Sequence, residues 1–144
     1  MRIKIKRLNP RARLPKRGSA SAAGYDLSAG EDVTIRPGQT ALIKTGLALE
    51  IPRGYFAMLC PRGSLALKQY LDMPHSIGIV DSDYRGEWIV PLRNLSARRT
   101  ARIPAGERIA QAIFLKHGVV DFVTVAKLGA TKRNQGRFGS TGKS

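Results

Sequence analysis

The sequence predicts an all-β fold, a sandwich or barrel built from short strands. Apolar and polar side chains alternate over many short segments, which is the pattern of a strand with one buried face. Gly, Pro, Asn and Asp residues separate these segments, and no long stretch keeps the helical period of about 3.6 residues. With 144 residues, 42% of them hydrophobic, the chain is long enough to bury the core of one domain.

Each expected strand lies between turn signals. Ile3 and Ile5 alternate with cationic residues, and Val33 and Ile35 repeat the alternation ahead of a Pro-Gly turn. In chain order, the expected strands are residues 2–6, 33–35, 41–51 with a break near Gly46, 55–60, 88–92, 108–115 and 119–126. Residues 64–71 are the one short stretch that favours a helix. After Leu128 the composition changes to small and polar residues, which is typical of an extended arm.

The charge of the chain is strongly positive, because 25 Lys and Arg residues stand against 10 Asp and Glu and give a net charge of +15. This balance favours binding of anions and polyanions without saying which. Neither a helix-turn-helix pattern nor a basic segment interleaved with aromatic residues accompanies the charge. Nucleic-acid binding through the basic surface therefore stays open, but it is not the expected main function.

Cysteine usage and hydropathy limit the class of protein. Cys60 is the only cysteine, so a disulfide within the chain is excluded, and with two histidines a Cys/His metal site is not expected. No apolar run approaches the roughly 20 residues of a membrane span, and the basic first residues lack the apolar part of a signal peptide. We therefore expect a cytoplasmic protein without a membrane segment.

Acidic residues are scarce, and three of the ten fall within residues 81–87. On a strand, Asp81 and Asp83 would share one face. A carboxylate kept ionised beside Arg85 could then act as the general base of a hydrolysis. The alternative is a turn in which the Asp side chains cap their own backbone, and the residues alone favour this alternative.

Three other segments carry groups suited to phosphate. Gly63 and Ser64 follow Arg62, which places a guanidinium beside backbone N–H groups and a hydroxyl. Gln111 lies among apolar residues of an expected strand, where its amide could bind a phosphate oxygen or orient a water. Residues 133–142 contain two arginines, two hydroxyls and a phenylalanine that could stack on a base. These segments suggest a site for a phosphorylated ligand that carries a base.

Five motifs then follow one another in order over most of the chain. They are AGYDLSA at 23–29, PRGSLALK at 61–68, GIVDSDYRGE at 78–87, GERIAQAIF at 106–114 and RNQGRFGSTG at 133–142. With this ordered set the chain resembles the trimeric deoxyuridine triphosphate nucleotidohydrolases, the dUTPases. The resemblance implies a jelly-roll or distorted β-barrel subunit over residues 1–128. It also implies a homotrimer in which residues 129–144 form a swapped C-terminal arm that closes over a neighbouring active site.

The resemblance implies an activity and roles for individual residues. The reaction would be hydrolysis of dUTP to dUMP and pyrophosphate, which limits uracil in DNA and supplies dUMP. Asp81 would be the general base that activates water for attack on the α-phosphorus, and Gln111 would hold that water. Asp26 would contact Mg²⁺, the expected cofactor, indirectly through water. Substrate contacts are implied for Arg62, Gly63, Ser64, His75, Gly78, Ile79, Val80, Asp83, Tyr84, Arg133, Phe138, Gly139, Ser140 and Thr141.

By the same resemblance, these contacts divide among the base, the sugar and the phosphates. The backbone of residues 78–83 would read the uracil edge, and Phe138 would stack on the uracil as the arm closes. Tyr84 would pack against the deoxyribose and exclude a 2′-hydroxyl. The expected phosphate contacts are Arg62, Ser64, Ser140 and Thr141, with Arg133 directed to the γ-phosphate.

The chain departs from the family pattern at three places. Gly63 stands where serine is usual, His75 stands where asparagine is usual, and Asn134 and Arg137 replace glycines of the arm. Loss of one oriented hydroxyl donor lowers turnover by about 10²-fold, so we expect a slower enzyme if Ser64 does not substitute. The change at His75 puts the pyrimidine selectivity in question.

Two alternatives stand beside the dUTPase hypothesis. A dCTP deaminase shares the fold, but its catalytic glutamate corresponds here to Pro91, which cannot transfer a proton. A nonenzymatic or weakly active dUTPase-like regulator that binds nucleotide or nucleic acid would agree with Gly63 and the +15 charge. The presence of Asp81, Gln111 and a complete arm favours the enzyme.

Overall fold

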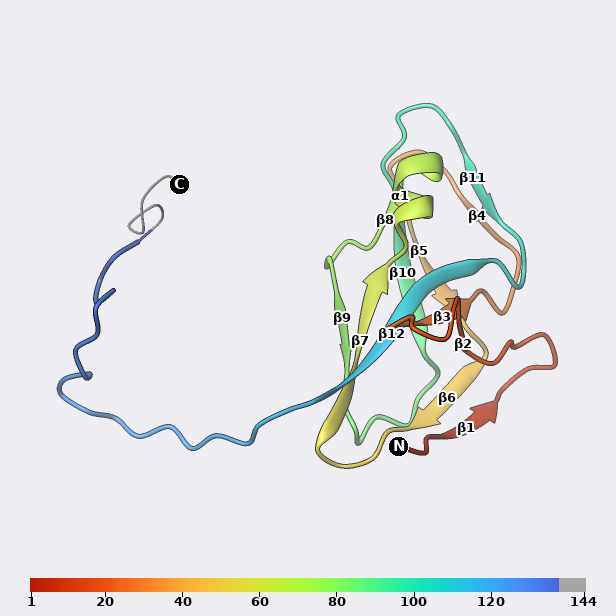
Figure 1. Cartoon of the computed structure of the whole chain (residues 1–144). Coiled ribbons are helices and arrows are strands. Elements are labelled where there is room, and N and C mark those ends of the chain that lie inside the picture. The colour runs from red at the N-terminus through yellow and green to blue at the C-terminus, as the bar shows by residue number, and fades with distance from the viewer. Residues whose placement is uncertain (138–144) are drawn as a thin grey trace.

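The structure, a computed structural model, describes residues 1–137, and these residues form an all-β subunit with one short helix (Figure 1). The substrate contacts expected from Phe138, Gly139, Ser140 and Thr141 lie outside the described residues. The strands are β1 Lys4–Arg7, β2 Lys16–Arg17, β3 Tyr25–Ser28, β4 Val33–Ile35, β5 Thr40–Lys44, β6 Leu47–Glu50, β7 Tyr55–Pro61, β8 Leu71–Asp72, β9 Gly78–Val80, β10 Ile89–Asn94, β11 Ala101–Ile103 and β12 Arg108–Lys116. Helix α1, Gly63–Gln69, lies between β7 and β8.

The strands pair into four sheets, with orders β1-β6, β5-β10-β8, β11-β4 and β2-β3-β12-β7-β9. Every pairing is antiparallel. The largest sheet is centred on β12, which pairs with β3 on one side and with β7 on the other. Because the sheets stay separate over residues 1–137, the described strands make a jelly-roll-like sandwich rather than one closed barrel.

The core lies between these sheets and consists of the apolar faces of alternating strands. Trp88, the single tryptophan, is fully buried and its ring lies 6.3 Å from that of Phe114. Leu27, Ile43, Leu47, Leu71 and Leu92 are also removed from solvent. Their burial fixes which face of each strand is left for the polar side chains that make the site.

A sharp bend at Gly46 separates β5 from β6 and anchors the loop that carries the acidic cluster. Gly46 has a φ of 71°, and a Cβ there would lie 2.6 Å from the Asn9 side chain, so only glycine fits. Its N–H donates to Glu87 Oε1 at 2.8 Å. The hydroxyl of Thr45 donates to the carbonyl of Trp88 at 2.7 Å. The end of the 81–87 loop is therefore tied to the core.

Most elements expected from the sequence are confirmed, including the break at Gly46 and the short helix after β7. The expected strand at 119–126 is wrong for this chain, since residues 118–126 pair with no neighbour and are exposed. The reason is topological: pairing of β12 with β7 ends at Lys116 opposite Tyr55, so no edge remains beside the continuing segment. Strands β2 and β8 have two residues each, too few to show alternation. The longer strands β3, β9 and β11 were also missed.

Within the described part of the chain, no helix has the length and apolarity needed to cross a membrane.

Candidate active site

A buried carboxylate organises one group of predicted site residues. Asp26 on β3 is only 7% exposed. Its Oδ1 accepts a hydrogen bond from Gln111 Nε2 at 3.2 Å and lies 3.3 Å from Arg62 Nε. Its Oδ2 accepts a hydrogen bond from Arg108 at 3.0 Å. One negative charge thus holds two guanidiniums and an amide close together, and such groups are chemically suited to phosphate oxygens.

A β-bulge brings Arg108 and Gln111 to the same carboxylate. Residues three apart on a regular strand point to opposite faces. The register of β12 against β3 shifts between Arg108 and Ala110, and this extra residue turns both side chains toward Asp26. Sequence reasoning missed Arg108 as a site residue, because alternation alone places it on the other face.

Two glycine-related features shape the surroundings of this carboxylate. A Cβ at Gly24 would lie 3.2 Å from Gln111 Cβ, so the glycine leaves room for the amide side chain. Arg62 is the extended residue that precedes helix α1, which begins at Gly63. A Cβ at Gly63 would meet nothing within 4 Å, and Ser64 is exposed beside it. The segment 62–64 therefore combines a partly buried guanidinium with an exposed hydroxyl two residues later.

The same carboxylate lies at one end of a cationic groove of about 930 Å³. We call it the basic groove. Its charged lining consists of Arg7, Arg11, Arg13, Lys16, Arg62 and Arg108, with the carboxylates Asp26 and Glu107. Glu107 accepts a hydrogen bond from Gln69 of α1 at 2.8 Å, which ties the helix to the rim of the groove.

The second group of predicted site residues lies on and after edge strand β9. A turn enters this strand: Ser76 has a φ of 62°, and the His75 ring nitrogen Nδ1 lies 2.8 Å from the carbonyl oxygen of Ile77. Because a carbonyl oxygen only accepts, His75 Nδ1 is the donor of this hydrogen bond. Gly78 lies against the imidazole, since a Cβ there would come within 3.2 Å of its Cε1. Gly78, Ile79 and Val80 then form β9 beside β7.

The acidic cluster is a turn and not a strand, which is the alternative that the residues alone favour, so Asp81 and Asp83 do not share a strand face. The N–H of Tyr84 donates to the carbonyl of Asp81 at 3.2 Å, and both carboxylates are exposed. The Arg85 guanidinium donates to the carbonyls of Ser82 and Tyr84, at 2.7 and 3.0 Å. Arg85 therefore stiffens the turn and is not within ion-pair distance of Asp81 in the described residues.

Tyr84 is positioned by the glycine two residues after it. Its hydroxyl donates to the carbonyl of Glu87 at 3.1 Å. A Cβ on Gly86 would overlap this hydroxyl, at 2.3 Å, so the ring can fold back only over glycine.

Near the same turn, the hydrogen bond and the charge of Lys4 hold the pKa of Glu50 below its ordinary value, with a smaller contribution from Arg85.

The two groups are far apart within one chain. Val80 is level with Ala57 of β7, and Ala57 is level with Phe114 of β12, so Asp81 stands about level with Leu115. Two strand spacings of about 4.8 Å and four rises of about 3.4 Å separate it from Gln111, or roughly 17 Å between Cα atoms. The side chains of Asp81 and Gln111 are too short to bridge a distance of about 17 Å. A site that needs both residues requires more than one copy of the chain.

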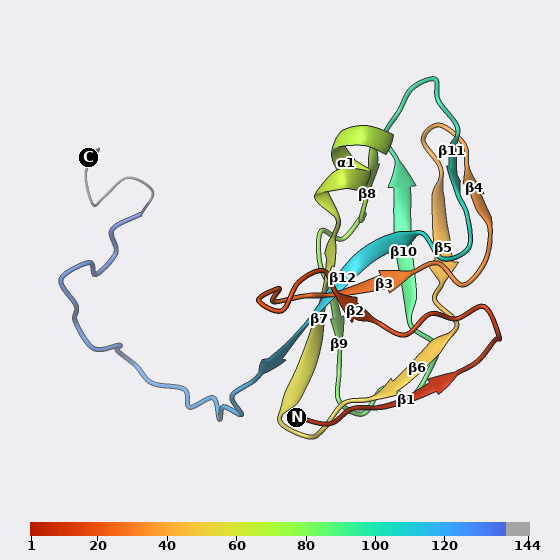
Figure 2. The same ribbon diagram turned by 45° about the vertical axis from the view of Figure 1, so that its right-hand side comes forward.

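Beyond β12 the chain runs away from the sheets, as Figures 1 and 2 both show. Residues 119–128 carry exposed apolar side chains, of which Phe122 is 96% exposed. Arg133, the expected γ-phosphate contact, is exposed and its Nε donates to the carbonyl of Gly136 at 3.2 Å. Arg133 therefore lies with neither of the two groups within one chain.

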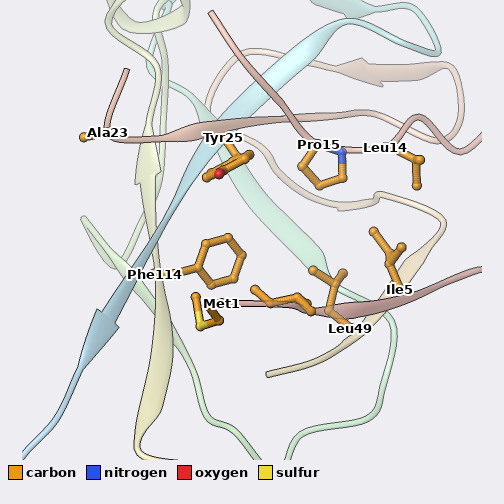
Figure 3. Close-up of a pocket in the computed structure, with 9 residues that line it drawn as sticks. Met1, Ile5, Leu14, Pro15, Ala23, Tyr25, Leu49 and Phe114 are labelled. Carbon is orange, nitrogen blue, oxygen red and sulfur yellow. The ribbon is translucent and has the colours of Figure 1, made fainter. Parts of the chain in front are cut away.

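A separate apolar cavity of about 500 Å³ lies on the opposite face of β3, between β1, β6 and β12 (Figure 3). The side chains of Tyr25 and Phe114 face each other there, with ring centroids 5.8 Å apart, and Met1 and Leu49 close the side toward β1. None of the described residues that line this cavity has a charged side chain, so the cavity does not suit a triphosphate.

Comparison with known proteins now decides the family. The family model for dUTPase matches residues 10–142. A deoxyuridine 5′-triphosphate nucleotidohydrolase of Nautilia profundicola is 45% identical over 99% of this chain and 100% of its own length. The enzyme of the same name from Wolinella succinogenes is 44% identical over 100% of this chain and 96% of its own length. The chain belongs to the dUTPase family.

A solved dUTPase agrees with this assignment in three dimensions. The structure of Staphylococcus bacteriophage 80alpha dUTPase with dUpNHpp superimposes with a TM-score of 0.88 and 27% identity, covering 99% of each chain. The jelly-roll expectation is thereby confirmed for this dUTPase chain. Of the predicted site residues, Arg62 and Gln111 contact Asp26, whereas Asp81 and Tyr84 lie in the turn after β9.

The oxygen donors of this dUTPase suit magnesium only in a limited way. Within residues 1–137, no three or more His, Cys, Asp or Glu side chains gather into a cage for a metal ion. Asp26 contributes one carboxylate that is already neutralised by two guanidiniums. Such a site fits an ion that keeps its waters and is carried mainly by substrate phosphates.

Proposed function

We propose that this protein hydrolyses dUTP to dUMP and pyrophosphate in an active site shared between copies of a homotrimer. The observation that carries the proposal is the cluster around Asp26. It holds Arg62, Arg108 and Gln111 as donors for phosphate oxygens at the end of the basic groove. The family relatives named above are deoxyuridine 5′-triphosphate nucleotidohydrolases, which supports the same substrate.

In the proposed reaction Asp81 removes a proton from a water molecule. The water oxygen attacks the α-phosphorus, and the bond from that phosphorus to the oxygen bridging to the β-phosphate breaks. Pyrophosphate leaves with the bond electrons, and dUMP keeps the new oxygen. The exposed carboxylate of Asp81 suits this role because a neighbouring copy can bring the nucleotide to it. Gln111, fixed by its hydrogen bond to Asp26, orients the water and the α-phosphate.

Base and sugar recognition are assigned to the β9 region. The backbone of β9 and its turn reads the uracil edge, with His75 at its entrance and Asp83 within the turn. Tyr84, held by its hydrogen bond to the Glu87 carbonyl, packs against the deoxyribose and leaves no space for a 2′-hydroxyl. Selectivity for deoxyribose then depends on the position of the Tyr84 ring, and this position requires glycine at residue 86.

Phosphate binding is assigned to Arg62, Gly63 and Ser64 at the start of α1, with Arg133 directed to the γ-phosphate. A magnesium ion carried by the triphosphate would neutralise part of its charge, and Asp26 is the residue proposed to contact it through water. Phe138 and residues 139–141 complete the proposed contacts and lie outside the described residues.

Assembly of a trimer is supported by two features of the single chain. Asp81 and Gln111 are too far apart to act together in one copy, as the strand register requires. Residues 119–128 expose apolar side chains that a neighbouring copy would cover. We propose that residues 1–128 form the subunit body and residues 129–144 the arm that reaches a neighbouring site.

The decisive test is release of pyrophosphate from a panel of magnesium nucleotides, namely dUTP, dCTP, dTTP and UTP. We expect turnover of dUTP and little or none of the others. Asp81→Asn should retain dUTP binding, measured by calorimetry, and lower hydrolysis by about 10²–10⁴-fold. Ammonia release from dCTP would indicate a deaminase, although Pro91 on β10 offers no ionisable group. Turnover by Asp81→Asn at the wild-type rate would remove Asp81 from the base role.

A further inference from the structure

We propose that the basic groove binds the phosphate backbone of single-stranded nucleic acid, a function separate from nucleotide hydrolysis. The proposal does not depend on the reaction proposed above. It concerns the part of the groove formed by residues 7–16, which lie outside all five sequence motifs.

The groove holds more positive charge than a nucleotide site uses. Six cationic side chains line it against two carboxylates. The carboxylate of Asp26 forms ion pairs with Arg62 and Arg108, and the carboxylate of Glu107 accepts a hydrogen bond from Gln69. Arg7, Arg11, Arg13 and Lys16 therefore add four cations beyond the pair that serves the triphosphate.

These four cations have little internal compensation. Arg13 donates to the carbonyl of Gly106 at 3.1 Å, which fixes its direction without neutralising its charge. Arg11 lies 3.6 Å from Asp32, and both side chains are 71% exposed, so solvent screens the pair. Arg7 and Lys16 have no acidic partner within 4.0 Å in the described residues. Unpaired cations along one concave surface raise the local concentration of polyanions.

The placement of the cations favours a chain-like anion over a flat one. Arg7 ends β1 and Lys16 begins β2, and the connection between these two strands is visible in Figure 2. Residues of this connection line the groove together with Arg108, the first residue of β12. Cations on β1, on β2 and its preceding connection, and on β12 suit a linear array of phosphates, which can contact them in succession. Among residues 1–137, no aromatic side chain lines the groove, so binding through phosphates without base stacking is expected to be independent of sequence.

The test measures binding of fluorescein-labelled oligothymidylate, about 20 nucleotides long to exceed one binding site, by anisotropy with the full chain. The groove variant replaces Arg7, Arg11 and Lys16 by alanine. The matched control removes the same number of charges elsewhere, with alanine at Arg93, Arg98 and Arg99, which are exposed and do not line the groove. Melting temperature and kcat for dUTP check that both variants keep the fold, and neither variant touches a residue assigned to hydrolysis.

Counterion release sets the expected magnitude. Each phosphate contact on a single strand contributes about −0.7 to the slope of log K against log salt, so three lost contacts flatten the slope by about 2. If the groove variant and the wild-type protein have the same association constant when extrapolated to 1 M salt, the variant binds roughly 100-fold more weakly at 0.1 M salt. The control should lose less than about 5-fold and keep the wild-type slope.

Three results would overturn the proposal. One is equal loss of affinity in the groove variant and in the control, which would indicate a diffuse charge effect. Another is absence of salt-dependent oligonucleotide binding by the wild-type protein while kcat/KM for dUTP falls in the groove variant, which would mean that the cations only steer the substrate. The last is capture by anionic phospholipid vesicles in the absence of oligonucleotide binding.

Discussion

Replacement of Asp26 by asparagine tests whether this carboxylate holds the phosphate-binding cluster together. Asp26→Asn keeps the shape of the side chain and one oxygen acceptor, but it removes the charge that faces Arg62 and Arg108. The variant is expected to lose stability in the absence of any ligand and to lose turnover in the presence of dUTP.

The size of the stability loss follows from the exposure of each partner. Arg62 is 19% exposed, so its contact with Asp26 counts as a largely buried charged interaction of about 1.5–3 kcal/mol. Arg108 is 55% exposed, so solvent reduces its contribution to about 0.2–1 kcal/mol. The bond from Gln111 survives, because an amide oxygen also accepts. We expect the free energy of unfolding to fall by about 2–4 kcal/mol, the sum of the two contributions.

Urea unfolding at fixed protein concentration, followed by fluorescence of the single buried tryptophan, Trp88, measures this loss. The matched control is Asp32→Asn. Asp32 faces Arg11 at 3.6 Å with both side chains 71% exposed, so a change below about 0.5 kcal/mol is expected. If both variants unfold at the same urea concentration as the wild-type protein, Asp26 is not an organising charge and the account of the cluster fails.

Three further predictions concern the proposed enzyme. Truncation after Leu128 should abolish most dUTP hydrolysis while the trimer persists in light scattering, and an unchanged rate would show that the arm takes no part. Gly86→Ala should displace the Tyr84 ring, because the new Cβ would overlap the Tyr84 hydroxyl. The preference for dUTP over UTP should then fall by about 10-fold. The control is Gly118→Ala, which has open space around it and should match the wild type. Gly63→Ser should raise kcat by up to about 10²-fold, since open space around position 63 accepts the hydroxyl and one oriented donor is worth that much; no gain would mean that the missing hydroxyl does not limit the rate.

The sequence by itself determined the fold class and the family. Alternation with a period of two identifies the longer strands because one face of each must be buried, and the bend at Gly46 follows from a conformation that only glycine adopts easily. The five ordered motifs were enough to indicate the family, since each contains groups that a nucleotide triphosphate requires.

Only the tertiary structure decided which of these groups meet. The bulge in β12 reverses the phase of alternation, so Arg108 and Gln111 reach Asp26 together although their spacing predicts opposite faces. The antiparallel register across β12, β7 and β9 places Asp81 far from Gln111. Local side-chain patterns report burial along one strand, whereas bulges and registers between strands depend on pairing with residues distant in the chain. For the same reason the segment after Lys116, apolar enough to suggest a strand, pairs with none of the other described residues.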